Sequence, residues 1–357
     1  MAQKISQYLL IILVLSLGFG QLLRFPVFGL SFYFHDILVL LLLLLNYKIP
    51  NLAPPLGLKI FFLGLGLGWL FAFTLYPALL LIVPSLYTLR LLAYLALYFQ
   101  LKSTKVVFSS SYFIMSGFIT LIIGLTQYLL MPDMRIFQYL GWDDHWNRLT
   151  LPHFDPTFTA VMLSLALLST VQALPRIWRL SSTGFLVSGI LLTYSRSVWL
   201  SLVLTFGYFM LKNKKLSYLL IGICLLIIPL ALLPKRLGEG TNLFRTYSIS
   251  SRLVSDQNYV QQYNWDLLLG RGLNTLVLDQ GFTHATGPNN SYLYLLLTSG
   301  VLGLIGWVMF MFSLYRQSRY KPLLIFFFLA SLFNNVMFYP FALLWILLVQ
   351  LKVPSAT

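Results

Sequence analysis

Long apolar runs recur along the whole chain and are separated by shorter polar segments. A helix needs about 20 apolar residues to cross the roughly 30 Å of hydrocarbon in a bilayer. Windows of that length predict twelve transmembrane helices, at residues 5–23, 31–46, 59–76, 78–101, 106–131, 155–174, 181–194, 197–211, 216–233, 290–314, 322–338 and 339–351. The expected fold is one all-α, polytopic transmembrane domain that takes up residues 1–357.

The first apolar run, Tyr8–Leu23, follows a single charge at Lys4 and carries no small-residue cleavage site. We therefore interpret it as a retained helix and not as a signal peptide. It places the N-terminus in the cytoplasm.

The composition agrees with a membrane protein, because 59% of the residues are hydrophobic and only 9% are charged. Soluble domains carry about 25% charged residues. The net charge of +15 would indicate nucleic-acid binding in a soluble protein, but basic short loops produce it in a membrane protein, so no nucleic-acid partner is expected. The single cysteine, Cys224, lies in an apolar run, which excludes an intrachain disulfide and a CxxC metal site.

The position of the charges predicts the topology. Threading the helices from a cytoplasmic N-terminus puts fourteen basic residues and no acidic residue inside, as the positive-inside rule requires. The fourteen are Lys4, Lys48, Lys59, Lys102, Lys105, Arg176, Arg179, Lys212, Lys214, Lys215, Arg316, Arg319, Lys321 and Lys352. An even number of helices then leaves both termini in the cytoplasm.

The external basic residues are nearly all arginines, namely Arg24, Arg135, Arg148, Arg196, Arg236, Arg245, Arg252 and Arg271, with one lysine, Lys235. Topology accepts either cation, whereas the planar guanidinium group suits two-pronged contact with phosphate oxygens. The bias therefore indicates an anionic ligand such as a lipid-linked phosphate or diphosphate. The alternative is pairing with the external acids or with lipid headgroups.

Two predicted loops are long enough to hold a site, at residues 132–154 and 234–289, and both are external. The second, of about 55 residues, exceeds the length that loops usually reach without a function. Within it, Ser250 or Ser251 could cap a short helix that runs to Leu268. Its apolar side chains could rest on the membrane interface: Leu253, Tyr259, Tyr263 and Leu267.

Three arginines are the candidate phosphate ligands. Arg252 is in the first turn of the predicted loop helix, where free backbone N–H groups favour an anion. Arg196 lies at the tip of the hairpin between the seventh and eighth predicted helices, beside a helix N-terminus. Arg271 stands between Gly270 and Gly272, which permit tight turns. The alternatives are a solvated charge for Arg252 and an interfacial anchor for Arg196.

Other polar residues have simpler interpretations. The loop residues Asp143, Asp144, His145, His153 and Asp155 match no compact metal motif, so we predict a solvated loop and no metal site. The aromatic residues of that loop could stack on sugars or lie at the interface: Trp142, Trp146 and Phe154. Arg90 lies deep in the fourth predicted helix and needs a partner, for which Asp36 is the candidate. Asn334 and Asn335 should form interhelical hydrogen bonds.

Three sequence features occur together in a fixed order. Tyr194-Ser195-Arg196-Ser197 lies at the hairpin tip, and Ser251-Arg252 is followed by Trp265 and Leu269-Gly270-Arg271-Gly272-Leu273. Pro288-Asn289-Asn290-Ser291-Tyr292-Leu293 then precedes Ser299-Gly300-Val301-Leu302-Gly303. In these features the chain resembles the bacterial O-antigen ligase and O-antigen polymerase superfamily of lipid-linked glycan transferases.

The resemblance implies a GT-C-like, metal-independent glycosyltransferase without a cofactor, in the bacterial inner membrane with its active face on the periplasmic side. It assigns Arg196 and Arg252 to the diphosphate of an undecaprenyl-linked donor. The family usually has a histidine, thought to act as a general base, where this chain has Asn289. Because an amide cannot take a proton, either His284 serves as the base or Asn289 and Asn290 only orient the acceptor.

The predicted function is transfer of a glycan from undecaprenyl diphosphate to a hydroxyl group of a lipid, glycan or protein acceptor. The alternative is a flippase or another secondary transporter, which also has about twelve helices. Transporters usually show repeated halves and broken helices near the membrane midplane. The chain shows no internal repeat, and its polar residues concentrate in an external loop, so the enzyme is favoured.

Overall fold

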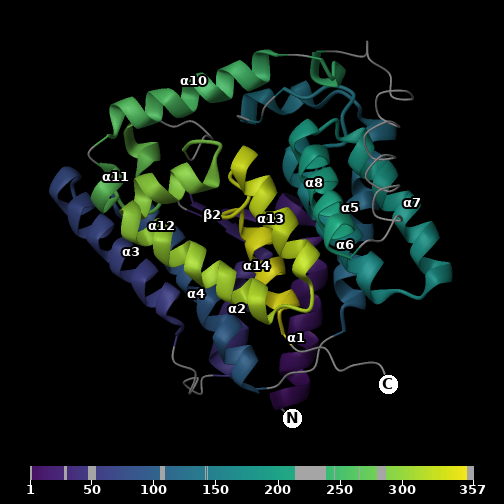
Figure 1. Cartoon of the computed structure of the whole chain (residues 1–357), viewed down its shortest axis with the longest axis horizontal. Coiled ribbons are helices and arrows are strands. Elements are labelled where there is room, and N and C mark those ends of the chain that lie inside the picture. The colour runs from purple at the N-terminus through teal and green to yellow at the C-terminus, as the bar shows by residue number, and fades with distance from the viewer. Residues whose placement is uncertain are drawn as a thin grey trace.

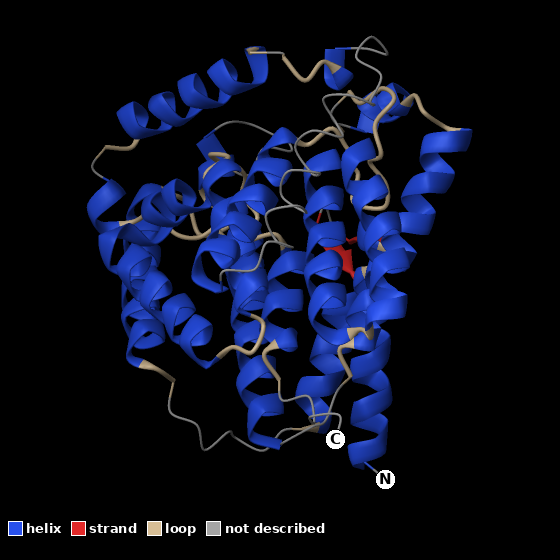
Figure 2. Ribbon diagram, turned by 45° about the vertical axis from the view of Figure 1, so that its right-hand side comes forward, coloured by secondary structure: helices blue, strands red, loops and turns tan. Residues whose placement is uncertain are grey.

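The computed structural model describes residues 2–27, 30–46, 54–104, 109–140, 142, 144–213, 239–244, 246–264, 266–279 and 287–351. In this part of the chain nearly all regular structure is helical, and the only strands form a small hairpin (Figure 2). The chain is therefore an all-α protein, as predicted. The predicted helix at residues 216–233 lies outside the described residues.

The elements follow one another along the chain with short connections. The long helices are α1 (Ala2–Leu17), α2 (Phe34–Leu45), α3 (Leu56–Leu75), α4 (Ile82–Thr104), α5 (Ser111–Leu130), α6 (Pro156–Ala173), α7 (Arg176–Leu192), α8 (Arg196–Asn213), α10 (Tyr247–Gln262), α12 (Ser291–Gln317), α13 (Lys321–Phe333) and α14 (Pro340–Val349). The short elements are α11 (Asp266–Leu269), η1 (Gly20–Leu23), η2 (Met134–Leu140), η3 (Glu239–Thr241), η4 (Leu276–Asp279), β1 (Arg24–Val27) and β2 (Leu30–Tyr33).

Within the described part of the chain, five helices are long and apolar enough to cross a membrane: α3, α4, α5, α6 and α12. Shorter apolar stretches lie in α1, α2, α7, α13 and α14. Several apolar helices of this kind indicate a protein embedded in the bilayer. The count of twelve spans stays a prediction.

The centre of the bundle is formed by α6 and α14. Ala160, Ala166 and Ser169 of α6 are fully buried, and every residue of α14 after Pro340 is buried. The start of α6 is well defined, because the Asp155 carboxylate accepts hydrogen bonds from the backbone N–H groups of Thr157 (2.5 Å) and Phe158 (3.0 Å). This cap holds the end of α6 beside the cavity described below.

The pair α3 and α12 packs closely through glycines. A side chain at Gly64 of α3 would collide with the backbone of Gly303 in α12, so only glycine allows this approach. Helix α12 is broken at Gly300, where φ is +67°, a conformation that residues with a side chain rarely adopt. The break is next to the carbonyls of Leu297 and Thr298, which accept hydrogen bonds from the following loop: Arg271 N at 2.9 Å and Gly272 N at 2.9 Å.

Helix α10 lies across one end of the molecule, at the top of Figure 1, and α1 begins at the opposite end. The loop helix predicted from Ser250 or Ser251 to Leu268 is thus present, but it begins at Tyr247 and is interrupted before α11. Its predicted interfacial face is partly wrong. Tyr259 and Tyr263 are buried against the protein, whereas Leu253 is 60% exposed.

Candidate functional site

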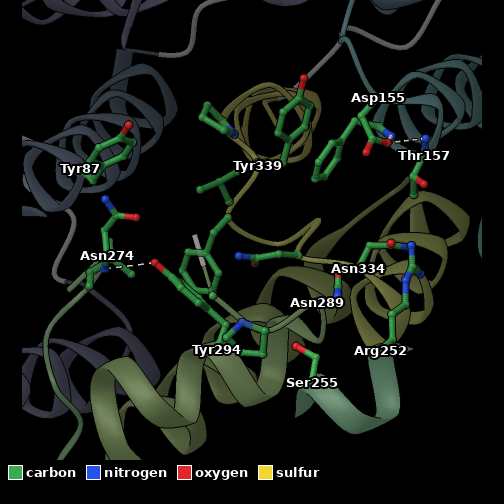
Figure 3. A pocket seen from close by; sticks show the side chains of 18 of the residues that line it. Tyr87, Asp155, Thr157, Arg252, Ser255, Asn274, Asn289, Tyr294, Asn334 and Tyr339 are labelled. Atoms are coloured by element: carbon green, nitrogen blue, oxygen red, sulfur yellow. Dashed lines mark hydrogen bonds between the residues drawn. The ribbon is translucent and has the colours of Figure 1, made fainter. Parts of the chain in front are cut away.

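A cavity of 1130 Å³ lies under α10. Its walls come from α10, the β1–β2 hairpin, α4, residues 287–289 at the start of α12, and the link between α13 and α14. Figure 3 shows side chains from these separate elements pointing toward one another, with Arg252, Asn289 and Asn334 on the same side. Elements far apart in the sequence therefore build one pocket.

Arg252 and Arg196 are brought together from two helices. Arg252 lines the cavity, and its Nη1 donates a hydrogen bond to the Phe333 carbonyl at 3.1 Å. Arg196 is the first residue of α8, before the apolar run 197–211, and its Nη1 donates to the Leu243 carbonyl at 2.9 Å. Burial first, and then the positive charge of Arg252, lower the pKa of Arg196. The two guanidinium groups therefore repel each other, and an anion between them would relieve that repulsion.

Asn334 ties the helix ends around these arginines together. Its Nδ2 donates to the Ser197 hydroxyl at 3.0 Å, and its carbonyl accepts from the Ser291 hydroxyl at 2.9 Å. These contacts join the end of α13 to the first residues of α8 and α12. The interhelical hydrogen bond predicted for Asn334 is confirmed.

The two neighbouring asparagines have different surroundings. Asn289 lines the cavity, so it is placed to contact a ligand. Asn290 caps α12, because its side-chain oxygen accepts from the backbone N–H groups of Tyr292 (2.9 Å) and Leu293 (3.2 Å). We therefore correct the assignment of Asn290 to the acceptor site. His284 lies outside the described residues, so its predicted role stays a prediction.

Asp256 is a polar residue of the site that the sequence analysis did not single out. It follows Arg252 by one turn of α10, and its carboxylate accepts a hydrogen bond from the backbone N–H of Asn289. Its Oδ1 is buried without a hydrogen-bond partner, and burial raises the pKa of the carboxyl group. The four-residue spacing from Arg252 was the available signal. Asp256 fixes the segment that carries Asn289.

We expect Asp256→Ala to lower transfer activity about tenfold, because the backbone of Asn289 loses its acceptor and a misplacement of about 1 Å can be that costly. Asp256→Asn should keep most activity, since an amide oxygen accepts the same hydrogen bond. Turnover of both variants at saturating donor tests this. Equal losses in the two variants would contradict a positioning role.

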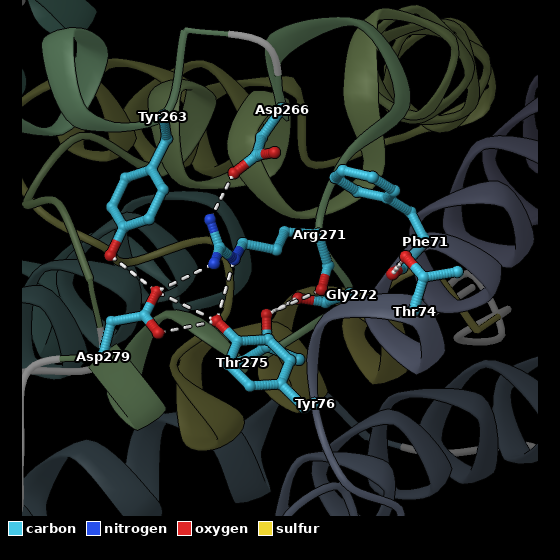
Figure 4. A network of polar contacts seen from close by, with 9 residues as sticks. All are labelled: Phe71, Thr74, Tyr76, Tyr263, Asp266, Arg271, Gly272, Thr275 and Asp279. Carbon is cyan, nitrogen blue, oxygen red and sulfur yellow. Dashed lines mark hydrogen bonds and ion pairs between the residues drawn. The ribbon is translucent and has the colours of Figure 1, made fainter.

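Arg271 belongs to a separate network, shown in Figure 4. It forms ion pairs with Asp266 at 2.7 Å and Asp279 at 3.2 Å, and its Nε donates to the Tyr76 hydroxyl at 2.8 Å. Its guanidinium group also stacks on the rings of Tyr76 and Tyr263. With two carboxylates already bound, Arg271 is not a free phosphate ligand. We therefore correct its assignment to the diphosphate site, since it joins α3, α11 and η4.

Arg271→Met should destabilise the solubilised protein by at least about 2 kcal/mol, because it leaves two partly buried carboxylates without their cation. The matched control is Arg135→Met, which removes an exposed ion pair with Asp133 and should leave the melting temperature unchanged. Thermal unfolding in detergent measures both. A wild-type melting temperature for Arg271→Met would contradict the structural role.

The loop at residues 132–154 offers no metal site in the part that the structure describes, where no three side chains of suitable type cluster. His153, one of the possible ligands considered above, is fully buried, and its Nδ1 lies 2.7 Å from the Tyr339 hydroxyl. Burial lowers the pKa of His153 to about 3, so the imidazole is neutral. Trp142 and Phe154 stack at 4.7 Å and line the cavity.

The comparisons with known proteins add no family assignment. Neither the protein-family models nor the curated protein sequences gave a match to this chain. The argument for a function therefore rests on the motifs and on the geometry of the cavity.

Proposed function

We propose that this chain is a membrane glycosyltransferase of the O-antigen ligase or polymerase type, which moves a glycan from undecaprenyl diphosphate to an acceptor hydroxyl group. The observation that carries the proposal is the meeting of Arg196 and Arg252, from two different helices, at one side of a large cavity. The cavity volume of 1130 Å³ is slightly above the roughly 300–1,000 Å³ of common small-ligand pockets. A pocket of this size suits a diphosphate together with sugar residues.

In the proposed reaction the acceptor oxygen attacks the anomeric carbon of the donor sugar. The bond from that carbon to the diphosphate oxygen breaks, and the hydroxyl proton passes to a base. Negative charge grows on the departing diphosphate, where Arg196 and Arg252 stabilise it as fixed donors. The side chain of Asn289 orients the acceptor by hydrogen bonding, and His284 is the candidate base.

The site is proposed to face the periplasm of a bacterial inner membrane, with both termini in the cytoplasm. Once Cys224 is replaced by serine, Gln261→Cys on α10 should react with a membrane-impermeant maleimide in intact spheroplasts. Ser103→Cys at the other end of α4 should react only after lysis. Both positions are exposed, which makes them a matched pair. The reverse labelling pattern would contradict the orientation.

A comparison of surface glycans from cells with and without the chain tests the function in vivo. Loss of a polymerase should leave single short repeats, and loss of a ligase should leave long chains that are not attached to their acceptor. Mass spectrometry of the lipid-linked and acceptor-linked pools distinguishes the two. Identical glycan pools in the two strains would count against the proposal.

A further inference from the structure

The side of the cavity that lies away from Arg252 carries a second pair of arginines. Arg24 begins β1 and is paired in register with Tyr33 at the end of β2. Arg90 of α4 places its guanidinium group 5.1 Å from the centre of the Tyr33 ring. Both arginines line the cavity. The hairpin and α4 therefore bring two guanidinium groups beside the same tyrosine.

This pair is separate from Arg196 and Arg252. Arg90 also covers the ring of Tyr87 at 5.1 Å. In Figure 3, Tyr87 and Arg252 lie on opposite sides of the pocket. A ligand that reached both pairs would have to extend across the cavity, as a glycan attached to a diphosphate does.

The second pair retains one positive charge. Arg90 is paired with Asp36 at 2.8 Å, as predicted, and donates to the Ser31 carbonyl at 2.6 Å. Both contacts use Nη2, and Nη1 is buried without a hydrogen-bond partner. Arg24 stacks on Trp142, and no described carboxylate forms an ion pair with it. Two guanidinium groups and one carboxylate leave the charge that one acidic group would balance.

The surrounding side chains are suited to a sugar ring. Tyr33, Tyr87, Trp142 and Phe154 line this part of the cavity, and the rings of Trp142 and Phe154 are nearly parallel. Aromatic faces pack against the apolar C–H faces of sugars, while arginines bind carboxylates in a two-pronged geometry. Lipid headgroups would supply the anion but not the ring.

We infer that Arg24 and Arg90 form a subsite for an acidic sugar, with its carboxylate on the guanidinium groups and its ring on the aromatic side chains. This subsite rests on the proposed function, and it restricts the substrates to glycans that carry a uronic acid or a similar sugar. The diphosphate lies on Arg196 and Arg252, and the acidic sugar lies across the cavity.

Two probes separate the subsite from the diphosphate site. The full chain in phosphatidylcholine nanodiscs is titrated with a glucuronate-terminated disaccharide, with its neutral glucose analogue, and with farnesyl diphosphate. The acidic disaccharide should bind at least about tenfold more tightly than the neutral one, corresponding to one charge-assisted contact of roughly 1.4 kcal/mol. Arg24→Gln should remove this preference and leave farnesyl diphosphate binding within about twofold.

Arg252→Gln should do the reverse, and Arg135→Gln, an exposed arginine outside the cavity, should change neither. Arg24→Gln is the deciding variant, since it removes no ion pair within the protein, whereas Arg90→Gln would leave Asp36 unpaired. Equal affinity for the acidic and neutral disaccharides would overturn the subsite. Competition by acetate or inorganic phosphate as strong as by the acidic disaccharide would also overturn it.

A lipid origin of the anion has its own arm. If phosphatidylglycerol in the nanodiscs abolished the preference for the acidic disaccharide, Arg24 and Arg90 would be headgroup ligands and the inference would fail. Loss of farnesyl diphosphate binding in every preparation, with the disaccharide preference intact, would remove the proposed function alone. The two failures are thus distinguishable.

Discussion

Replacing Arg252 or Arg196 by lysine should lower the rate of glycan transfer by about a hundredfold or more, with unchanged expression and melting temperature. Removal of one preorganised donor from a developing anion commonly costs about 10²–10³ in rate. Lysine keeps the charge but loses the planar fork of donors. In the structure each arginine already commits one nitrogen to a backbone carbonyl, and a lysine could not bond that carbonyl and the diphosphate with the same geometry.

The matched control is Arg135→Lys, which lies outside the cavity and should retain wild-type turnover. Arg245→Lys, outside the described residues, should also matter less. Initial rates at saturating donor measure the four variants. Near-native turnover in Arg196→Lys or Arg252→Lys would remove that arginine from the diphosphate site.

His284→Ala is expected to lower turnover by about a hundredfold, the usual contribution of a general base. With wild-type His284, activity should fall as the pH drops through about 6.5, the ordinary pKa of histidine, because the protonated imidazole cannot accept a proton. The alanine variant should lose this pH dependence. Transfer rates between pH 5 and pH 8 measure both effects.

Asn289 supplies the competing outcome. If it orients the acceptor without a base, Asn289→Ala should be impaired while His284→Ala is nearly silent. Asn289→His restores the residue that the resembled family has, and a faster rate would mean that the natural chain works without a base at that position. A silent His284→Ala removes our preferred base.

Much of the bundle could be predicted from hydropathy, because a membrane span must be long and apolar. The β1–β2 hairpin could not, since two strands of four residues between apolar helices show no separate pattern. The second predicted span began at residue 31, whereas the structure keeps Leu30–Tyr33 in a strand and begins α2 at Phe34. As a result the sequence gave no indication that Arg24 lies beside Arg90.

The site was predictable where a residue's own neighbours define its role. Arg196 at a hairpin tip and Arg252 in a loop helix are visible locally. Arg271 was misassigned because its partner Tyr76 comes from a distant helix. Tyr259 and Tyr263 were assigned to the membrane interface because periodicity shows which residues share a face and not what that face covers. In the structure they face the protein.

The most direct test is a transfer assay with the purified chain in proteoliposomes. The liposomes contain an undecaprenyl-diphosphate-linked glycan and an acceptor glycan or lipid, and the assay follows free undecaprenyl diphosphate and extended acceptor together. We predict equal amounts of the two products, and loss of both with Arg252→Lys. Movement of the intact lipid-linked glycan across the bilayer without either product would contradict the account and identify a flippase.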